Sequence, residues 1–309
     1  MTRSHADRNA ATTGQHDVER HDLPAAGRGA REQLVAKIPV VERRLQLAGV
    51  STAVLEGGNG PPVVLLHGPG EFALTWMRVI PGLVANHRVI APDLPGHGAS
   101  QVTDGRLDSG RVFAWLDELI TRTCPSPPAL VGHLLGGAIA ARFASDHADR
   151  LSRLVLVDTF GLGRLRPSPR FALTLITYLA RPTKRKQDRF FRQCFVDLDG
   201  LREQAGGVME QLEEYALDRA HAPSQKAALR SLMPRLGVPP IPPEDLARIA
   251  VPTTLIWGRH DRQVRLRAAE AASVRHDWPL QVIENAADDP ASEQPEAFLR
   301  ALRNALGVA

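Results

Sequence analysis

The chain has 309 residues, of which 43% are hydrophobic, and its formal net charge is +4 at pH 7. This composition can bury the core of one α/β domain with an insertion, and the small charge without a nucleic-acid motif argues against a nucleic-acid partner. No apolar run approaches the ~20 residues that span a bilayer. The two cysteines lack metal-binding spacing, which predicts reduced thiols, no metal and a cytoplasmic location.

Residues 1–40 are predicted to form a flexible N-terminal arm. The segment Met1–Arg31 is polar and charged, and it lacks the apolar stretch of a secretory signal peptide. A segment of this composition has too little apolar surface to bury to pack by itself.

From residue 41 onward, short apolar segments alternate with amphipathic ones. The period-2 and continuous apolar runs predict strands, and the 3.6-residue spacing predicts helices. The predicted strands are Val41–Leu47, Val50–Leu55, Pro62–Leu66, Arg88–Pro92, Pro128–Val131 and Leu151–Val157. The predicted helices are Trp76–Ala85, Leu107–Arg122 and Gly136–His147.

The alternation stops over residues 160–243, where no strand is evident. Helices are predicted there near Phe171–Ala180, Asp188–Phe195, Leu201–Arg219 and Lys226–Leu236. Strands then return at Thr253–Trp257 and Leu280–Glu284, with helices at Arg265–Arg275 and Ala291–Leu306. We therefore predict an α/β core over 41–159 and 244–309, with a mostly parallel sheet, helices on both faces and a helical lid insertion over 160–243.

The stretch Leu130–Gly137 joins a strand to a helix through a sharp turn. Gly132, Gly136 and Gly137 place small residues on both sides of one side chain, as in the pattern Gly-x-Ser-x-Gly. Leu134 occupies the central position. Leucine has no lone pair and no ionisable proton, so it cannot attack a carbonyl.

Five motifs occur in order along the alternation of strands and helices. They are His67–Gly70, Ala91–Gly98, Gly132–Gly137, Trp257–Asp261 and Asp288–Phe298. Together they resemble the α/β-hydrolase fold superfamily over roughly Val41 to the C-terminus. Because this fold hosts many chemistries, the resemblance predicts the architecture more strongly than the reaction.

The resemblance implies a nucleophile at the turn, an acid late in the chain and a His before the last helix. At the matching positions this chain has Leu134, Asp261 and Asp288. Two of the three groups are therefore missing, unless the turn is misaligned. For Asp288 the alternative is a solvated residue before a helix, with Asp289 as its cap and Pro290 at its first position.

The resemblance also implies two backbone N–H donors for an oxyanion. Leu135, at a helix N-terminus, can supply one. The second usually comes from the residue after the His-Gly pair, which here is Pro69 and has no N–H. Gly70 or Glu71 can substitute only if the loop is displaced. Loss of one donor typically costs about 10²–10³ in rate, which weakens the acyl-transfer interpretation.

We predict that Asp288 and Asp261 are catalytic, because the resemblance implies that these two positions touch. Two carboxylates in contact do not both ionise easily, so the pKa of one should rise. A ligand is expected in an apolar pocket under the lid. The predicted binding residues are Pro69, Gly70, Glu71, Phe72, Trp76, His133, Leu134 and Leu135.

The leading hypothesis is a non-hydrolytic enzyme of the isomerase, epimerase, lyase or cyclase type, in which the substrate supplies part of the chemistry. Its ligand would be a small or peptidic, partly apolar metabolite, in keeping with secondary metabolism, and no cofactor is implied. The alternatives are a non-catalytic ligand-binding protein and an inactivated ester hydrolase. A homodimer is left open.

The predicted lid is basic. Nine Lys or Arg residues and one acid, Asp188, lie between Arg164 and Arg192. A solvated face explains this most simply. The alternative is attraction of an acidic ligand, a carrier protein or a membrane surface.

Overall fold

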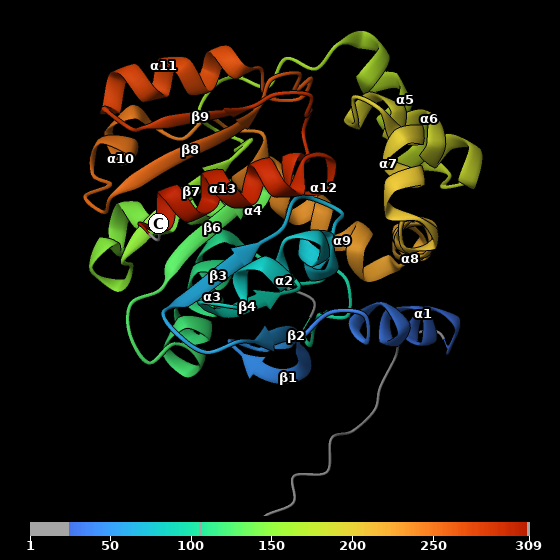
Figure 1. Cartoon of the computed structure of the whole chain (residues 1–309), viewed down its shortest axis with the longest axis horizontal. Helices are drawn as coiled ribbons and strands as arrows, with labels where there is room; N and C mark the ends of the chain where they lie inside the picture. Colours follow the sequence, from blue (N-terminus) through green and yellow to red (C-terminus); the bar gives the residue numbers. More distant parts are fainter. Residues whose placement is uncertain (1–24, 105–106, 308–309) are drawn as a thin grey trace, which may run out of the picture.

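The computed structural model describes residues 25–104 and 107–307. A nine-stranded sheet forms its centre, in the order β1-β2-β4-β3-β6-β7-β8-β9, with β5 paired to β2 (Figure 1). The strands from β4 to β9 in that order run parallel, whereas β2 is antiparallel to β1, β4 and β5. The strand bounds are β1 Val41–Leu47, β2 Val50–Gly57, β3 Pro62–Leu66, β4 Arg88–Pro92, β5 Gln101–Val102, β6 Ala129–His133, β7 Arg153–Val157, β8 Thr253–Gly258 and β9 Leu280–Ile283.

Helices cover both faces of the sheet, as the sequence predicts. Alternate residues of β3 show the two faces, because Val64 packs in one apolar cluster and Val63 in another. The first cluster includes side chains of α3, α4 and α11, and the second includes side chains of α2 and α13. Their bounds are α2 Ile80–Leu83, α3 Ser109–Thr123, α4 Leu135–Asp146, α11 Leu266–His276 and α13 Pro295–Leu306.

Between β7 and β8 the chain is helical and contributes no strand to the described part of the sheet. Helices α5 to α8 stand beside the sheet, at the right of Figure 1. The helices of this insertion are α5 Pro169–Ala180, α6 Lys184–Cys194, α7 Leu198–Ala205, α8 Gly207–His221, α9 Pro223–Leu232 and α10 Pro243–Ala247, with a π-helical turn, η3, at Met233–Gly237.

Part of the predicted N-terminal arm is folded, which corrects the sequence prediction. Helix α1 spans Ala25–Val35, and Leu34 and Ile38 are buried. The rest of the predicted arm, residues 1–24, lies outside the described residues. The sequence pattern does not predict this helix because few of its residues are apolar and its most important contact is made by a charged side chain.

That charged side chain is Arg31, which is only 2% exposed. Its Nη1 lies 3.0 Å from Oδ2 of Asp93, which follows β4, and its Nε lies 2.7 Å from Oε2 of Glu42 in β1. Nη1 also donates to the hydroxyl of Tyr215 in α8, at 3.3 Å. Helix α1 therefore ties the helical insertion to the sheet.

Three predicted helices are broken in the structure. Instead of one helix over Trp76–Ala85, a 3₁₀-helix, η1 (Ala73–Arg78), precedes α2, whose second residue is Pro81. Leu201–Arg219 divides into α7 and α8 at Gly206, whose φ of 57° suits glycine. The last helix is preceded by a separate turn, α12 (Pro290–Glu293). Proline ends a preceding helix because it cannot donate a backbone hydrogen bond.

No helix in 25–104 or 107–307 combines the length and apolarity that crossing a bilayer requires.

Candidate functional site

The turn between β6 and α4 holds Leu134 in an unusual backbone conformation. Its φ is 45° and its ψ is −106°, a region that a side-chain-bearing residue occupies at a cost of about 1–3 kcal/mol. The Leu134 N–H donates to the Val157 carbonyl at 3.0 Å, and the Leu134 carbonyl accepts from Ala138 and Phe160. The surrounding backbone therefore holds the strained turn in place.

The glycines beside Leu134 are needed for close packing. A Cβ at Gly136 would lie 2.4 Å from the Leu66 carbonyl oxygen, and one at Gly132 would lie 2.5 Å from the Gly136 carbonyl oxygen. Any larger residue would force β3, β6 and α4 apart. The sharp strand-to-helix turn predicted from the sequence is therefore present, with the Leu134 side chain at its apex and 2% exposed.

The loop after β3 closes on itself through Glu71. The Gly68 N–H donates to Oε2 of Glu71 at 2.7 Å, and the Glu71 N–H points to the Gly68 carbonyl at 3.4 Å. This loop is where the resemblance places an oxyanion donor. Pro69 has no N–H to offer, and a carboxylate occupies the loop instead. A negative oxygen developing beside it would be repelled.

His133 pairs with this carboxylate. Its Nδ1 lies 3.2 Å from Oε2 of Glu71, and its Nε2 donates to the Asp288 carbonyl oxygen at 2.5 Å. Burial alone would lower the pKa of His133, but the Glu71 carboxylate outweighs it and raises that pKa to about 10. Burial opposes ionisation of Glu71 as well, yet His133 holds the pKa of Glu71 below its usual value. The pair is therefore a buried imidazolium and a half-buried carboxylate.

A second histidine of the motifs, His67, has a structural position. Its Nε2 accepts the Leu94 N–H at 2.9 Å, so its Nδ1 is the nitrogen that donates to the Gly68 carbonyl at 2.8 Å. Burial lowers the pKa of His67. His67 is therefore a neutral side chain that joins two loops.

Three buried carboxyl groups follow the ends of three neighbouring strands. Asp158 follows β7, Asp261 follows β8 and Asp288 follows β9, and their exposed fractions are 0%, 6% and 4%. Asp288 is thus buried, which excludes the alternative of a solvated residue before a helix. Its neighbour Asp289 does cap α12, because its Oδ1 accepts the Ser292 N–H at 3.0 Å.

These carboxyl groups have few hydrogen-bond donors. Oδ1 of Asp261 accepts the N–H groups of Gln263 and Val264, at 2.6 and 3.0 Å. Within the described residues, Oδ2 of Asp158, Oδ2 of Asp261 and Oδ1 of Asp288 are buried without any donor. Asp158 lies close enough to Asp261 to hydrogen-bond with it once one of the two carries a proton.

Burial therefore dominates the ionisation of this group. It raises the pKa of Asp261 to about 7, against the lowering effect of its two backbone donors. It raises the pKa of Asp288 well above the usual value, and the charge of Asp261 raises it further. Burial and Asp261 have the same effects on the pKa of Asp158. The predicted rise in pKa is thus found, and it involves three carboxyl groups.

Gln263 connects the two predicted catalytic residues. Its backbone N–H donates to Asp261, and its side-chain amide donates to Oδ2 of Asp288. On the other side of Asp288 lies Cys194 of α6, whose carbonyl accepts the Asp288 N–H at 3.4 Å. Burial, followed by the charge of Asp288, raises the pKa of the Cys194 thiol, so it stays protonated.

The predicted apolar binding residues lie in two clusters. Phe72 packs edge-on against Tyr215, with 4.6 Å between ring centroids, and Trp76 packs in the same cluster. Leu134 and Leu135 belong to the cluster on the other face of the sheet. Pro69 and Gly70 are half-buried, and the Gly70 carbonyl accepts from the Gln225 side chain at 3.0 Å. Their contact with a ligand stays a prediction.

The residues of this site lie within the match to a known protein family. A sequence model of the alpha/beta hydrolase family matches residues 63–301. The chain belongs to the alpha/beta hydrolase family. The match includes the turn at Leu134, the loop at Glu71 and all three buried carboxyl groups, so the whole candidate site lies within the family fold.

Two relatives of this chain are hydrolases by name. The pimeloyl-[acyl-carrier protein] methyl ester esterase of Aeromonas hydrophila is 27% identical over 264 residues, which cover 84% of this chain and 100% of the esterase. The 2-hydroxy-6-oxo-6-(2'-aminophenyl)hexa-2,4-dienoic acid hydrolase of Metapseudomonas resinovorans is 29% identical over 244 residues, covering 74% of this chain and 78% of that enzyme.

A solved structure shows the same fold. The 2-hydroxy-6-oxo-6-phenylhexa-2,4-dienoate hydrolase of Rhodococcus sp. strain RHA1 superposes with a TM-score of 0.75 at 23% identity, covering 88% of this chain and 100% of that one. The arrangement of strands and helices in this alpha/beta hydrolase chain is thus shared over 88% of its length.

Sequence reasoning missed three contributors to the site. Asp158 directly follows an apolar strand, and because parallel strands end at the same edge of a sheet, its position was a usable signal. Gln263 and Cys194 had no such signal, because their contacts with Asp288 depend on how the insertion and the loop after β8 fold. Among the described residues of this alpha/beta hydrolase chain, no three His, Cys, Asp or Glu side chains are arranged to hold a metal ion.

Proposed function

We propose that this chain is a non-hydrolytic enzyme of the alpha/beta hydrolase family that transfers a proton through Asp261 and Asp288. The observation that carries the proposal is the row of buried carboxyl groups with unpaired oxygens, centred on an Asp261 whose pKa is raised to about 7 by burial. A group with its pKa near the working pH is the most effective general acid or base. Isomerisation, epimerisation, elimination and cyclisation all need such a group.

The roles of the two residues follow from their environments. Asp288, with its pKa raised by burial and by Asp261, keeps its proton and can donate it. Asp261, when ionised, can accept a proton from carbon, and Asp158, whose pKa burial raises, keeps its own proton and can donate a hydrogen bond to Asp261. Two protonated carboxyl groups and one that ionises near pH 7 thus lie together, and water is excluded because all three are buried.

Acyl transfer is disfavoured by three features of the same site. Leu134 at the apex of the turn offers no nucleophile. The loop that should stabilise an oxyanion presents Pro69 and the Glu71 carboxylate. Asp288 stands where the resemblance implies a histidine base. The substrate class proposed from the sequence, a small or peptidic and partly apolar metabolite, is unchanged.

The experiment follows deuterium from solvent into carbon. A panel of ketones and thioesters that each bear one acidic C–H bond is incubated with the protein in D₂O and followed by proton NMR. We expect exchange in at least one compound without cleavage, with a rate that changes near pH 7. Asp288→Asn and Asp261→Asn should each lose about 10²-fold or more. Asp149→Asn, at an exposed site, is the matched control.

Two outcomes contradict this proposal. Exchange that persists in both variants would remove the two carboxyl groups from the mechanism. Hydrolysis of p-nitrophenyl butyrate with a covalent acyl adduct would restore the acyl-transfer interpretation.

Binding of panel compounds without exchange would instead support the alternative, a ligand-binding protein. Ester hydrolysis gained only by Leu134→Ser with Asp288→His would support the third hypothesis, an inactivated ester hydrolase.

A further inference from the structure

A cavity of about 360 Å³ lies between the loop after β7 and the start of α11. Its wall contains four arginines, Arg164 and Arg166 from the loop and Arg265 and Arg267 from the α11 side. None of its lining residues is acidic. The residues that line the cavity therefore carry four positive charges and no negative one.

These four guanidinium groups have no partner within the described part of the chain, either in an ion pair or in a side-chain hydrogen bond. All four are exposed, so they remain hydrated and movable. Like charges gathered around one cavity repel each other, and an anion bound among them would relieve that repulsion.

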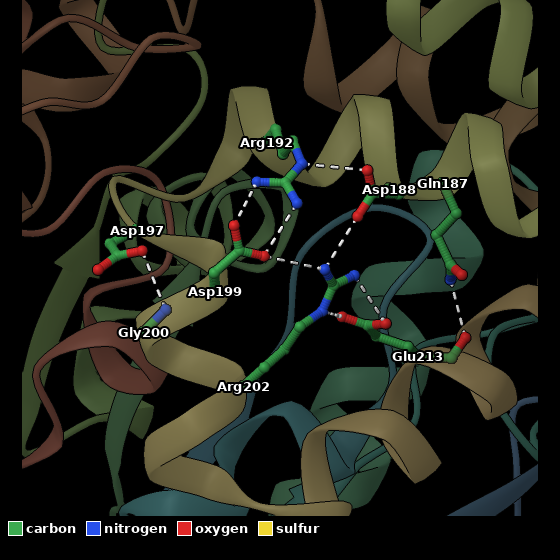
Figure 2. Close-up of polar contacts among 8 residues, drawn as sticks. All are labelled: Gln187, Asp188, Arg192, Asp197, Asp199, Gly200, Arg202 and Glu213. Atoms are coloured by element: carbon green, nitrogen blue, oxygen red, sulfur yellow. Dashed lines mark hydrogen bonds and ion pairs between the residues drawn. The ribbon is translucent and has the colours of Figure 1, made fainter.

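A second cavity in the insertion shows the contrast. Its lining has three basic residues, Lys184, Arg185 and Arg202, and three acidic ones, Asp188, Glu210 and Glu213. Figure 2 shows that carboxylates hold Arg202, which lines this cavity, and Arg192 of α6: Arg202 contacts Glu213 and Asp188, and Arg192 contacts Asp188 and Asp199. Arg202 is thus neutralised at the second cavity, whereas the four arginines of the first cavity have no ion-pair partner among the described residues.

The start of α11 adds to the positive potential of the first cavity. Arg265 precedes the helix and provides no side-chain cap. The first N–H groups of an α-helix have no acceptor within the helix, and they carry its positive dipole end. Such a terminus beside arginines is a setting in which proteins bind phosphate.

We propose that this arginine-lined cavity binds the phosphate monoester or diphosphate group of a small molecule. The planar guanidinium donates two parallel hydrogen bonds to phosphate oxygens, and two pairs of arginines, one pair from each lining segment, match a group with a charge of −2 or more. A cavity of this size also has room for part of the organic body that carries the phosphate. This proposal does not depend on whether the protein is an enzyme.

The cavity also adjoins the carboxyl groups. Gln263 and Val264 line it, and the same two residues donate their N–H groups to Asp261. The Gln263 side chain reaches further, to Asp288. Gln263 would therefore lie between a phosphorylated molecule in the cavity and the Asp288 carboxyl group.

The experiment is a calorimetric titration with pyrophosphate and, separately, with inorganic phosphate, at constant ionic strength. The wild type is compared with Arg265→Gln/Arg267→Gln and with Arg164→Gln/Arg166→Gln, which change the two segments that line the cavity. Arg300→Gln is the matched control, because Arg300 is an exposed arginine on α13 outside the cavity. Each double variant should weaken pyrophosphate binding by at least about tenfold, and the control by less than about twofold.

Circular dichroism and the Tm without ligand show whether each variant is folded, and either double variant alone is enough for the test. The proposal is overturned if pyrophosphate does not bind, or if it binds equally to the wild type and to folded double variants. It is also overturned if equimolar sulfate binds as tightly as pyrophosphate and both are lost together as salt rises, because that is general attraction to positive charge.

Discussion

Glu71 and His133 form an ion pair in which His133 is buried and Glu71 is half-buried, with 3.2 Å between Oε2 and Nδ1. One residue comes from the loop after β3 and the other from the end of β6, directly before the strained turn at Leu134. The pair occupies the place where a hydrolase of this fold would handle a developing negative oxygen. The two side-chain charges neutralise each other, so this pair does not supply a positive charge to a developing negative oxygen.

The ion pair predicts a pH dependence of stability. The folded-state pKa of His133 is about 10, compared with 6.5 for the free side chain. Its contribution is therefore fully present below pH 6.5 and is lost as the pH rises through 10. In Glu71→Gln, burial lowers the His133 pKa instead, so this loss should disappear. Urea unfolding at pH 6, 8 and 10 compares the two proteins, and a neutral His133 ring in the wild type at pH 8, seen by nitrogen-15 NMR, would refute the ion pair.

Asp261 predicts an effect in a lower pH range. Its pKa is about 7 in the folded chain, compared with 3.8 for the free side chain, so the folded protein binds the extra proton between these values. Stability should fall as the pH rises from about 4 to 7 and stay low above that range. Asp261→Asn should raise the free energy of unfolding by roughly 2–4 kcal/mol at pH 8 and have little effect at pH 4. An equal effect at both pH values would contradict a raised pKa.

Leu134 predicts a reversal of the usual order of two substitutions. Leu134→Ala removes buried methyl groups but keeps a side chain in the strained conformation, so it should cost about 2–4 kcal/mol. Leu134→Gly removes slightly more, yet it relieves the strain and should be about 1 kcal/mol more stable than Leu134→Ala. Thermal unfolding of the two variants gives the comparison. If the alanine variant is the more stable, the turn is not strained.

Arg31 predicts that a charged residue of α1 supports the fold. Arg31→Met leaves Asp93 buried without its counter-ion, and this should cost roughly 3–5 kcal/mol. Arg43→Met is the control, because Arg43 pairs with Glu56 at a position that is 54% exposed, and its loss should cost roughly 0–1 kcal/mol. Denaturant unfolding measures both. Equal losses would show that the contacts of α1 are no stronger than a surface ion pair.

The sequence predicts the sheet well because its parallel strands are continuous apolar runs, such as Pro62–Leu66, that need burial on both faces. It predicts the turn at Leu134 because a close backbone contact at such a turn requires glycine, and Gly132 and Gly136 stand on either side of it. Positions for Asp261 and Asp288 follow from the resemblance. By contrast, the partners of Glu71 and Arg31 lie far along the chain, at His133 and Asp93, and no local sequence pattern predicts such contacts.

The contacts of α1 have a practical consequence for anyone trimming this protein. The family match begins at residue 63, so a fragment chosen by that boundary would lack α1 and the first two strands. Asp93 would then lose its guanidinium, and α8 would lose its anchor to the sheet. If such a fragment has low solubility or a collapsed insertion, the cause would be the loss of α1 and the first two strands, and not the chemistry of the intact protein.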